Sequence, residues 1–476
     1  MLSIDHVDWL ELIRVTLHPL AKFPGPKLAG ASYCYEFWYE VICGIQYTQK
    51  IIKLHEQYGP IVRINPDELH FNDVDFVDVV YTAGARKRDK SSHYLAGFGG
   101  VSKSTFGTLD HMHHRTRRRA LNKFFSKSRV LQIEDSIHEK SQQLCDKFLA
   151  YRDQGPFDLT GAFSCIATDT VTEYCFGSSP GFLNQDGWEP NCKSYFETIE
   201  RMAHVTRHVP WILYLAKWLP LSIIRLVSSD LNSFLVDTRV KKPERLKRVV
   251  LDAERHDAKD CPVFLELLNS DLPPREKSKQ RFMYEANGAT LAGSGSTAIA
   301  MSNIVYNLVA NPRIGHKLRS ELLGKVSDPK NLPRWSSLEE LPYLTAVIHE
   351  GLRSMYDPSK ERLPYDPSQE RLPRIATEEE LIYKDGSTPG KSKYVIPRGY
   401  AIGTSAHVVH SDESIFPNAS QFNPERWLGR DGQRNRELER HLLSFSKGSR
   451  YCLGMHCRCT TCLALPASVR NGTRGY

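Results

Sequence analysis

Apolar residues recur at helical spacing through most of the chain between about residues 130 and 354, and this pattern constrains the fold more than any other feature. Its longest stretch runs from Lys277 to Asn311, where an Asn-Pro pair ends it because proline disfavours a helical conformation in the residue before it. Extended segments are few. IVRI and ELHF flank a turn at residues 65–67 as a hairpin, and short strands are expected at YVIP and after Gly399. The sequence therefore predicts a mainly α fold with small β-sheets near both ends.

The chain has 476 residues, of which 41% are hydrophobic, and this is enough to bury a large core. Length alone suggests about three domains, but no Gly/Ser-rich or Pro-rich linker divides the sequence, so we expect one large domain. The formal net charge of +8 is concentrated at residues 115–119, RTRRR, which predicts a local basic face and no nucleic-acid binding. The eleven cysteines do not resemble a secreted disulfide scaffold, and this favours a reducing compartment.

Two segments bear on membrane contact. The first 17 residues contain Asp5, Asp8 and Glu11, so they form neither a signal peptide nor a spanning helix, which needs about 20 apolar residues. The segment from Val209 to Val227 is apolar but is interrupted by charged residues and proline. It is expected to be either an interfacial segment in peripheral contact with a membrane or a buried pair of helices.

The last part of the chain is rich in cysteine. Cys452, Cys457, Cys459 and Cys462 are separated by four, one and two residues, which fits neither a zinc ribbon nor a ferredoxin cluster. A zinc-binding interaction module that uses these cysteines stays open as an alternative, and it predicts stoichiometric zinc.

Cys452 has a different setting from the other three. It lies in the run Phe445-Ser-Lys-Gly448-Ser-Arg450-Tyr-Cys452-Leu-Gly454. The glycines allow tight turns that direct N–H groups at a sulfur, Phe445 can shield the sulfur, and Arg450 can meet an anion. A thiolate bound to an iron in a flat macrocycle needs these features. The pattern FxxGxRxCxG resembles the haem-binding loop of the cytochrome P450 family, the haem-thiolate monooxygenases.

Two further segments resemble motifs of that family in the family's order. His349-Glu350-Gly-Leu-Arg353 lies on a predicted helix and is not the HExxH motif of a zinc protease. It resembles the family's ExxR pair, and the later run Pro-Glu-Arg426 resembles the segment whose arginine joins that pair. The resemblance implies that Glu350, Arg353 and Arg426 brace the haem loop.

The long predicted helix contains Leu-Ala-Gly293-Ser-Gly295-Ser296-Thr297. Each glycine costs about 1 kcal/mol relative to alanine, so either a flat cofactor with O2 or a second helix is expected to approach closely. The stretch resembles the family's oxygen-activation motif, AGx(D/E)T(T/S), but Gly295 stands at the usual acid position and Ser296 at the usual threonine position, with Thr297 next to it. The resemblance implies that Ser296 hydrogen-bonds bound O2 or an ordered water, and that the acid which relays protons is absent.

The usual interpretation of a basic segment such as residues 110–119 is a run of charged side chains exposed to solvent. By resemblance it is the helix that holds the haem propionates, with His114 at the family's aromatic position and Arg118 at its arginine. Arg374 and Arg450 resemble further propionate contacts. The remaining basic residues are expected to dock an acidic electron donor, which is NADPH-cytochrome reductase in this family.

The resemblance covers nearly the whole chain and is nearest to fungal secondary-metabolism members similar to trichodiene oxygenase. It implies an N-terminal arm and proline-rich hinge over residues 1–30, a haem-thiolate catalytic domain over 31–456, and an atypical tail over 457–476. The helix that follows the ligand cysteine in the family, and the closing strands, are expected to be missing from this tail. Cys457, Cys459 and Cys462 are expected to have no role.

The main hypothesis is a haem-thiolate monooxygenase that uses electrons from an NADPH-dependent reductase to insert one atom of O2 into a lipophilic, secondary-metabolite or terpenoid-like substrate. The alternative is a catalytically impaired haem-binding remnant, which Gly295 and the shortened C-terminus favour. Family members lie on the cytosolic face of the endoplasmic reticulum membrane. Because the chain lacks a spanning anchor, it is expected to be peripheral there or cytoplasmic.

Overall fold

A computed structural model describes residues 11–212, 248, 261–328, 331–355, 371–384 and 393–468. Most of the expected interfacial segment, residues 213–227, lies outside these ranges. None of the helices within them is long and apolar enough to cross a membrane.

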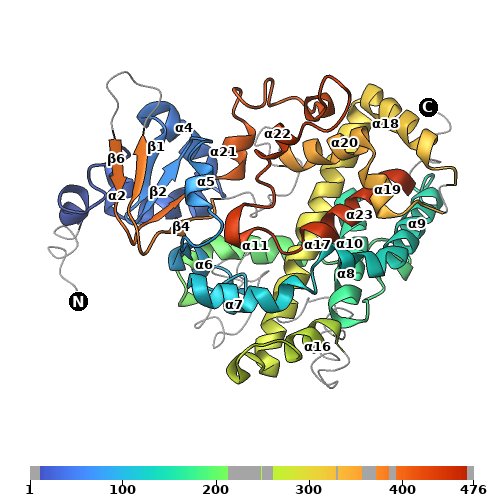
Figure 1. The fold of residues 1–476 in the computed structure, drawn as a ribbon, viewed down its shortest axis with the longest axis horizontal. Helices are drawn as coiled ribbons and strands as arrows, with labels where there is room; N and C mark the ends of the chain where they lie inside the picture. The colour runs from blue at the N-terminus through green and yellow to red at the C-terminus, as the bar shows by residue number, and fades with distance from the viewer. Residues whose placement is uncertain are drawn as a thin grey trace.

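Helices make up most of the described chain (Figure 1), which confirms the mainly α prediction. The longer helices are α4 (Tyr47–Tyr58), α7 (His111–Asn122), α9 (Glu134–Ala150), α10 (Leu159–Phe176), α11 (Lys193–His208), α17 (Lys279–Ala310), α18 (Pro312–Lys325), α20 (Pro342–Arg353) and α23 (Met455–Ser468). The shorter helices are α2 (Lys27–Ala31), α3 (Cys34–Phe37), α5 (Val77–Val80), α6 (Ser92–Ala96), α8 (Lys127–Val130), α16 (Pro262–Leu268), α19 (Trp335–Glu339), α21 (Ala406–His410) and α22 (Arg436–Glu439).

Helix α17 runs through the middle of the helical part of the molecule (Figure 1). Ser278 caps it by accepting a hydrogen bond from the Arg281 N–H at 3.3 Å, and the helix ends at Ala310, before the Asn-Pro pair. The predicted long helix is therefore confirmed. Helix α10 packs so closely against it that a Cβ at Gly293 would lie 2.7 Å from Cγ2 of Val171. Close packing of two helices thus accounts for the first of the two glycines.

Strands from both ends of the chain form one sheet with the order β1-β2-β7-β4-β3 (Figure 1). Strands β1 (Ile61–Asn65) and β2 (Glu68–Phe71) form the predicted hairpin. Strand β7 (Ala401–Gly403) pairs in parallel with β2 and antiparallel with β4 (Arg374–Ile375), which in turn pairs with β3 (Asp89–Lys90). Strands β5 (Leu381–Lys384) and β6 (Lys393–Ile396) form a separate hairpin. The strands expected at YVIP and after Gly399 are thus present as β6 and β7.

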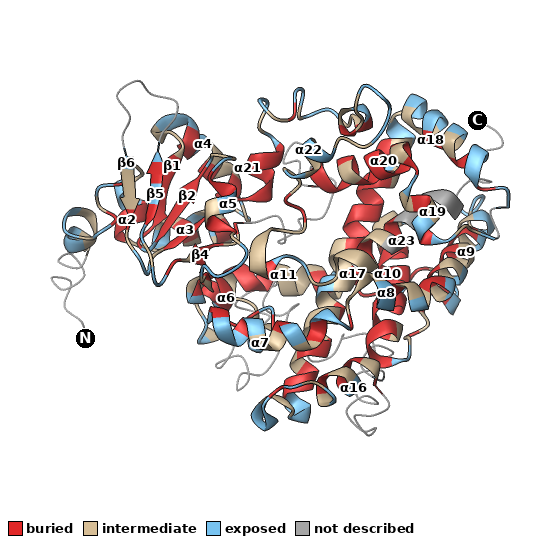
Figure 2. Cartoon of the chain, viewed as in Figure 1, coloured by how far each residue is buried: buried red, intermediate tan, exposed pale blue. Residues whose placement is uncertain are grey.

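Buried residues follow α10, α17 and α20 through the interior (Figure 2). They belong to the largest hydrophobic cluster, and a second cluster packs against the sheet. The helical and sheet parts therefore each have a core of their own.

Helix α23 begins three residues after Cys452 and corrects one part of the predicted fold, because the helix after this cysteine was expected to be missing. It packs against α9, α17, α19 and α20. A buried cysteine packs like a small hydrophobic residue, so the buried Cys462 and the partly buried Cys457 and Cys459 give this helix its apolar contacts with the core. Residues 469–476, which follow this helix, lie outside the described ranges.

Candidate active site

The loop around Cys452 is tied down at two points. The Cys452 N–H donates to the Phe445 carbonyl at 2.8 Å, and the Ser449 N–H donates to the Thr82 carbonyl at 3.1 Å. Gly448 has a φ of +72°, and a Cβ there would collide with the Thr82 carbonyl oxygen, so this turn needs glycine. Cys452 is exposed at the end of the loop, where its sulfur is accessible to a ligand.

The two other predicted residues of the loop lie on either side of the cysteine. Phe445 is partly buried against the main core. Gly454 has open space where a Cβ would lie, and its carbonyl accepts from the Arg458 N–H at 3.1 Å in the first turn of α23. The loop therefore leads directly into the helix.

Glu350, in the last turn of α20, is completely buried and brings together the three residues predicted to form a brace. Arg353 donates to both carboxylate oxygens, from Nε at 2.9 Å and from Nη2 at 2.8 Å, and Arg426 donates from Nε at 3.3 Å. Trp427, which sequence reasoning missed, donates its indole N–H at 2.9 Å.

The brace reaches the cysteine loop through the neighbouring backbone. The Ser444 hydroxyl, directly before Phe445, donates to the Leu352 carbonyl at 2.9 Å. Arg353 also donates to the His410 carbonyl at 2.7 Å. The Ser444 hydrogen bond therefore holds the start of the loop against α20, one residue from Arg353 of the buried ion pair.

Five buried basic side chains lie together near the loop, and we call them the cation cluster: Lys90, His114, Arg118, Arg374 and Arg450. Arg118 Nη1 donates to the Tyr451 carbonyl at 2.6 Å, and Arg450 Nη1 donates to the Thr108 carbonyl at 2.6 Å. Within the described ranges, none of the lysine and arginine members forms an ion pair with a carboxylate, and their hydrogen bonds go to backbone oxygens. Lys90 was missed by sequence reasoning, whereas the other four were predicted.

Electrostatics within the cation cluster are unfavourable to positive charge. Burial, followed by the nearby Arg374, lowers the pKa of Arg450 to about 9. Burial and the charges of Arg450 and Lys90 lower the pKa of His114 to about 2. Arg118 Nη2 is buried and has no hydrogen-bond partner among the described residues. Because buried charge is costly unless it is paired, these residues fit a ligand that carries negative groups, and the two propionates of haem meet this requirement.

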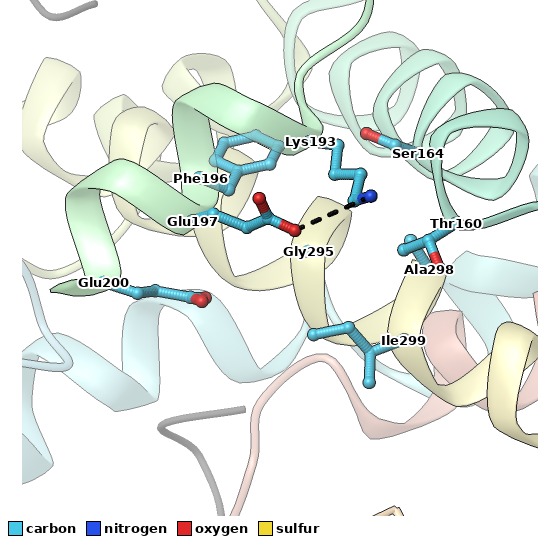
Figure 3. Close-up of a pocket in the computed structure, with 9 residues that line it drawn as sticks. All are labelled: Thr160, Ser164, Lys193, Phe196, Glu197, Glu200, Gly295, Ala298 and Ile299. Atoms are coloured by element: carbon cyan, nitrogen blue, oxygen red, sulfur yellow. Dashed lines mark ion pairs between the residues drawn. The ribbon is translucent and has the colours of Figure 1, made fainter. Parts of the chain in front are cut away.

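The residues predicted to activate oxygen lie in the middle of α17. Ser296 donates its hydroxyl to the Ala292 carbonyl at 2.7 Å, and Thr297 is buried. Gly295 lines a small pocket that it shares with Glu200 and Lys193 of α11 (Figure 3). A side chain at position 295 would therefore point toward Glu200 and Phe196 of α11.

Arg458 of α23 joins three parts of this region and was also missed by sequence reasoning. Its Nη2 donates to the Ser296 carbonyl at 2.9 Å and lies 2.8 Å from Sδ of Met355. Its guanidinium carbon lies 5.6 Å from the centre of the Phe445 ring. The helix after the cysteine loop is thus fastened to α17 by a buried arginine.

The terminal cysteines are poorly suited to a metal. Burial raises the pKa of Cys457 and Cys459 to about 12 and that of Cys462 to about 11. Among the described residues, the terminal cysteines do not belong to any group of three ligand atoms that lie within 4.8 Å of one another, and this disfavours the zinc-module alternative.

One other group of possible metal ligands exists in the described chain, and it lies away from the cysteines. Glu36, His93 and His208 place ligand atoms within 4.8 Å of one another. Glu36, however, forms an ion pair with Arg371 and lies 3.5 Å from Nη1 of Arg207. Two guanidinium groups beside this carboxylate disfavour a further cation, so we assign the group to holding α3 against α11.

Comparisons with known proteins agree with this geometry. A family model described as Cytochrome P450 matches residues 34–457. The chain is 63% identical to "Cytochrome P450 monooxygenase ppzE" of Metarhizium rileyi, over 100% of this chain and 96% of that protein. It is 37% identical to "Tryptophan 6-hydroxylase fscE" of Fusarium equiseti, over 94% and 84% of the two chains, and 34% identical to "Cytochrome P450 monooxygenase TRI4" of Fusarium sporotrichioides, over 92% and 80%. The resemblance found in the sequence is confirmed, and the chain belongs to the cytochrome P450 family as a monooxygenase similar to those of fungi.

Proposed function

We propose that this chain is a haem-thiolate monooxygenase that inserts one atom of O2 into a lipophilic small molecule of fungal secondary metabolism. The observation that carries this proposal is the cation cluster, which lacks carboxylate partners within the described chain and adjoins the cysteine loop. Arg450 belongs to the loop, and Arg118 bonds to the Tyr451 carbonyl beside Cys452. A negatively charged macrocycle with an iron that accepts a thiolate satisfies both features at once.

In this proposal Cys452 holds the iron through its thiolate and the cation cluster holds the propionates. Bound haem supplies an iron that activates O2, and thiolate donation favours cleavage of the O–O bond. The Phe445 carbonyl and Gly448 keep the loop turned so that the sulfur faces the site. Ser296 and Thr297 offer hydroxyl groups from α17 for orienting O2 or water.

The electron donor is proposed to be an NADPH-cytochrome reductase that docks on α7. This helix buries His114 and Arg118 and exposes Arg115 and Arg119. Exposed arginines attract an acidic partner, and their effect on the association rate weakens with salt. The cytosolic face of the endoplasmic reticulum membrane is the proposed location, as for the family.

The proposed division of the chain keeps an arm at residues 1–30, a catalytic domain at 31–456 and a tail at 457–476. Helix α23 crosses the last boundary, so the described part of the tail packs with the catalytic domain.

The test is the difference spectrum of the reduced, carbon monoxide-bound protein, produced with haem supplied. We expect a strongly red-shifted Soret band that disappears in Cys452→Ala, because alanine cannot supply a thiolate. Cys34→Ala, which removes another exposed thiol, should keep the band. A band without turnover would favour the haem-binding remnant, and stoichiometric zinc without haem would favour the zinc module.

A further inference from the structure

All three nitrogens of one guanidinium in the cation cluster, that of Arg450, donate to backbone carbonyl groups. Nε donates to the Arg88 carbonyl at 3.2 Å, Nη1 to the Thr108 carbonyl at 2.6 Å, and Nη2 to the Leu109 carbonyl at 2.6 Å. Two of the three acceptors thus lie next to each other, just before α7. The orientation of this guanidinium therefore depends on what fixes the backbone there.

Arg117 of α7 bonds to the same short segment. Its Nη1 donates to the Thr108 hydroxyl at 2.8 Å and to the Lys103 carbonyl at 3.3 Å. The Thr108 hydroxyl in turn donates to the Ser104 carbonyl at 3.0 Å. Thr108, which is buried, is therefore bonded to Arg450 through its carbonyl and to Arg117 through its hydroxyl.

Glu276, at the end of the short helix Pro274–Glu276 before α17, collects three basic side chains. Arg117 donates to both carboxylate oxygens, from Nε at 2.8 Å and from Nη2 at 3.0 Å. Arg281 Nε donates to Oε2 at 3.0 Å, and His113 Nε2 lies 2.7 Å from Oε1. Burial raises the pKa of Glu276, but hydrogen bonds from Arg117 and His113 oppose it and lower the pKa to about 2. Glu276 is therefore a carboxylate at neutral pH.

A second carboxylate holds the same segment to α17. The Thr105 N–H donates to Oε1 of Glu285 at 2.8 Å, and Arg281 Nη2 donates to the same oxygen. The segment thus has an attachment that does not involve Glu276. Removing the Glu276 carboxylate should therefore loosen Thr108 without releasing the whole segment.

We propose that Glu276 is a positioning residue for haem binding, because it fixes Arg117, which fixes Thr108, which fixes the Arg450 guanidinium. A carboxylate that accepts two hydrogen bonds from one guanidinium sets the plane of that guanidinium, and so the direction in which Arg117 donates to Thr108. This role rests on the proposed function, in which the cation cluster holds the haem propionates. Outer partners of this kind orient the groups that contact a cofactor.

Hydrogen exchange of the haem-loaded protein tests the contacts. Glu276→Gln should raise the exchange rate of the amides at residues 103–109 by about fivefold or more, because the segment loses one of its attachments. The matched control is Glu425→Gln, which breaks the exposed ion pair with Lys317 and should leave these amides unchanged. Unchanged exchange in Glu276→Gln would overturn the proposal.

The rate of haem transfer to an excess of apomyoglobin tests the role. Glu276→Gln should lose haem about tenfold faster than the wild-type protein while it keeps the red-shifted carbon monoxide band. Thr108→Val removes the hydroxyl that Arg117 contacts and should have a similar effect. Thr108→Ser keeps the hydroxyl and should lose haem at least about fivefold more slowly than Thr108→Val.

The double variant distinguishes positioning from a general loss of stability. Glu276→Gln and Thr108→Val act on the same hydrogen bond, so together they should lose haem no more than about twofold faster than either alone. Multiplication of the two effects would overturn the proposal, as would unchanged haem loss in Glu276→Gln. In both cases a red-shifted band in the wild-type protein would leave the haem-thiolate function standing. A wild-type protein without that band would overturn the function and the role of Glu276 together.

Discussion

At position 350 one carboxylate forms ion pairs with two guanidinium groups that have little access to water. Glu350 is completely buried, and the side chains of Arg353 and Arg426 are 3% and 6% exposed. Removing one member of such a group leaves the others charged and buried, which costs more than the interaction itself contributes. The brace therefore depends strongly on a single residue.

We expect Glu350→Gln to lower the free energy of unfolding by about 3 kcal/mol, measured by urea denaturation of the haem-free protein. The matched control is Glu425→Gln, which breaks an ion pair with Lys317 in which both side chains are about half exposed. This control should change stability by less than about 1 kcal/mol. Equal losses in the two variants would contradict the structural role of Glu350.

Residues that belong to a local pattern could be predicted from the sequence, and isolated ones could not. Glu350 and Arg353 lie one helical turn apart, so their pairing follows from spacing alone. The sequence around Lys90 contains no recognisable motif. Lys90 joins the cation cluster only because β3 pairs with β4, which places it opposite Arg374. Trp427 directly follows the predicted Arg426, and the order of the sequence does not reveal that its indole N–H reaches Glu350.

At the scale of elements, Gly293 and Gly295 of α17 have different physical reasons to be glycine. Gly293 allows α10 to approach, since a Cβ would lie 2.7 Å from a buried valine side chain. Gly295 borders a pocket where a Cβ has 3.7 Å of space. The pattern of two glycines in three residues could be noticed in the sequence, but which neighbour approaches each one could not.

Replacing each glycine by alanine should therefore shift stability in opposite directions. Gly293→Ala should lower the free energy of unfolding by about 1–3 kcal/mol, because the core must move to accept a methyl group. Gly295→Ala should raise it by about 0.5–1 kcal/mol through helix propensity. Thermal and urea unfolding of the two variants provide the measurement. Destabilisation by both would show that position 295 is as tightly packed as position 293.

Helix α23 shows how an element can be missed. The family resemblance predicts a long apolar helix at this place, and the cysteines at positions 457, 459 and 462 depart from that pattern. Cys462 nevertheless packs in the main core, and Arg458 bonds to the backbone of α17. The physical requirement at this place is an apolar face, which several kinds of residue can provide.

At the scale of the whole molecule, buried neutral histidines occur in several separate regions. Burial lowers the pKa of His55 and His349 to about 4 and that of His410 to about 3. The unfolded chain, with histidine pKa values near 6.5, therefore binds more protons than the folded chain between these values. Stability is complete above pH 6.5 and is lost as the pH falls toward the folded pKa values.

We expect the free energy of unfolding to fall steeply between pH 6.5 and 5, by up to about 1.4 kcal/mol per pH unit for each such histidine. His349→Gln should make this dependence shallower, whereas His316→Gln, at an exposed position, should leave it unchanged. Urea denaturation at pH 7.5, 6.5 and 5.5 measures the slopes. Identical slopes in His349→Gln and wild type would show that folding does not lower the pKa of His349.

The order of the sheet has a consequence for how the chain is made. The hairpin β1-β2 is translated early, but the edge of β2 at Glu68–His70 pairs with Ala401–Gly403, which leaves the ribosome only near the end of synthesis. Contacts so distant in sequence slow folding, and an unpaired strand edge is an open template for association with other chains. During translation the chain therefore carries an unpaired strand edge while the helices from α5 to α20 are being made, and an exposed edge of this kind favours association with other chains.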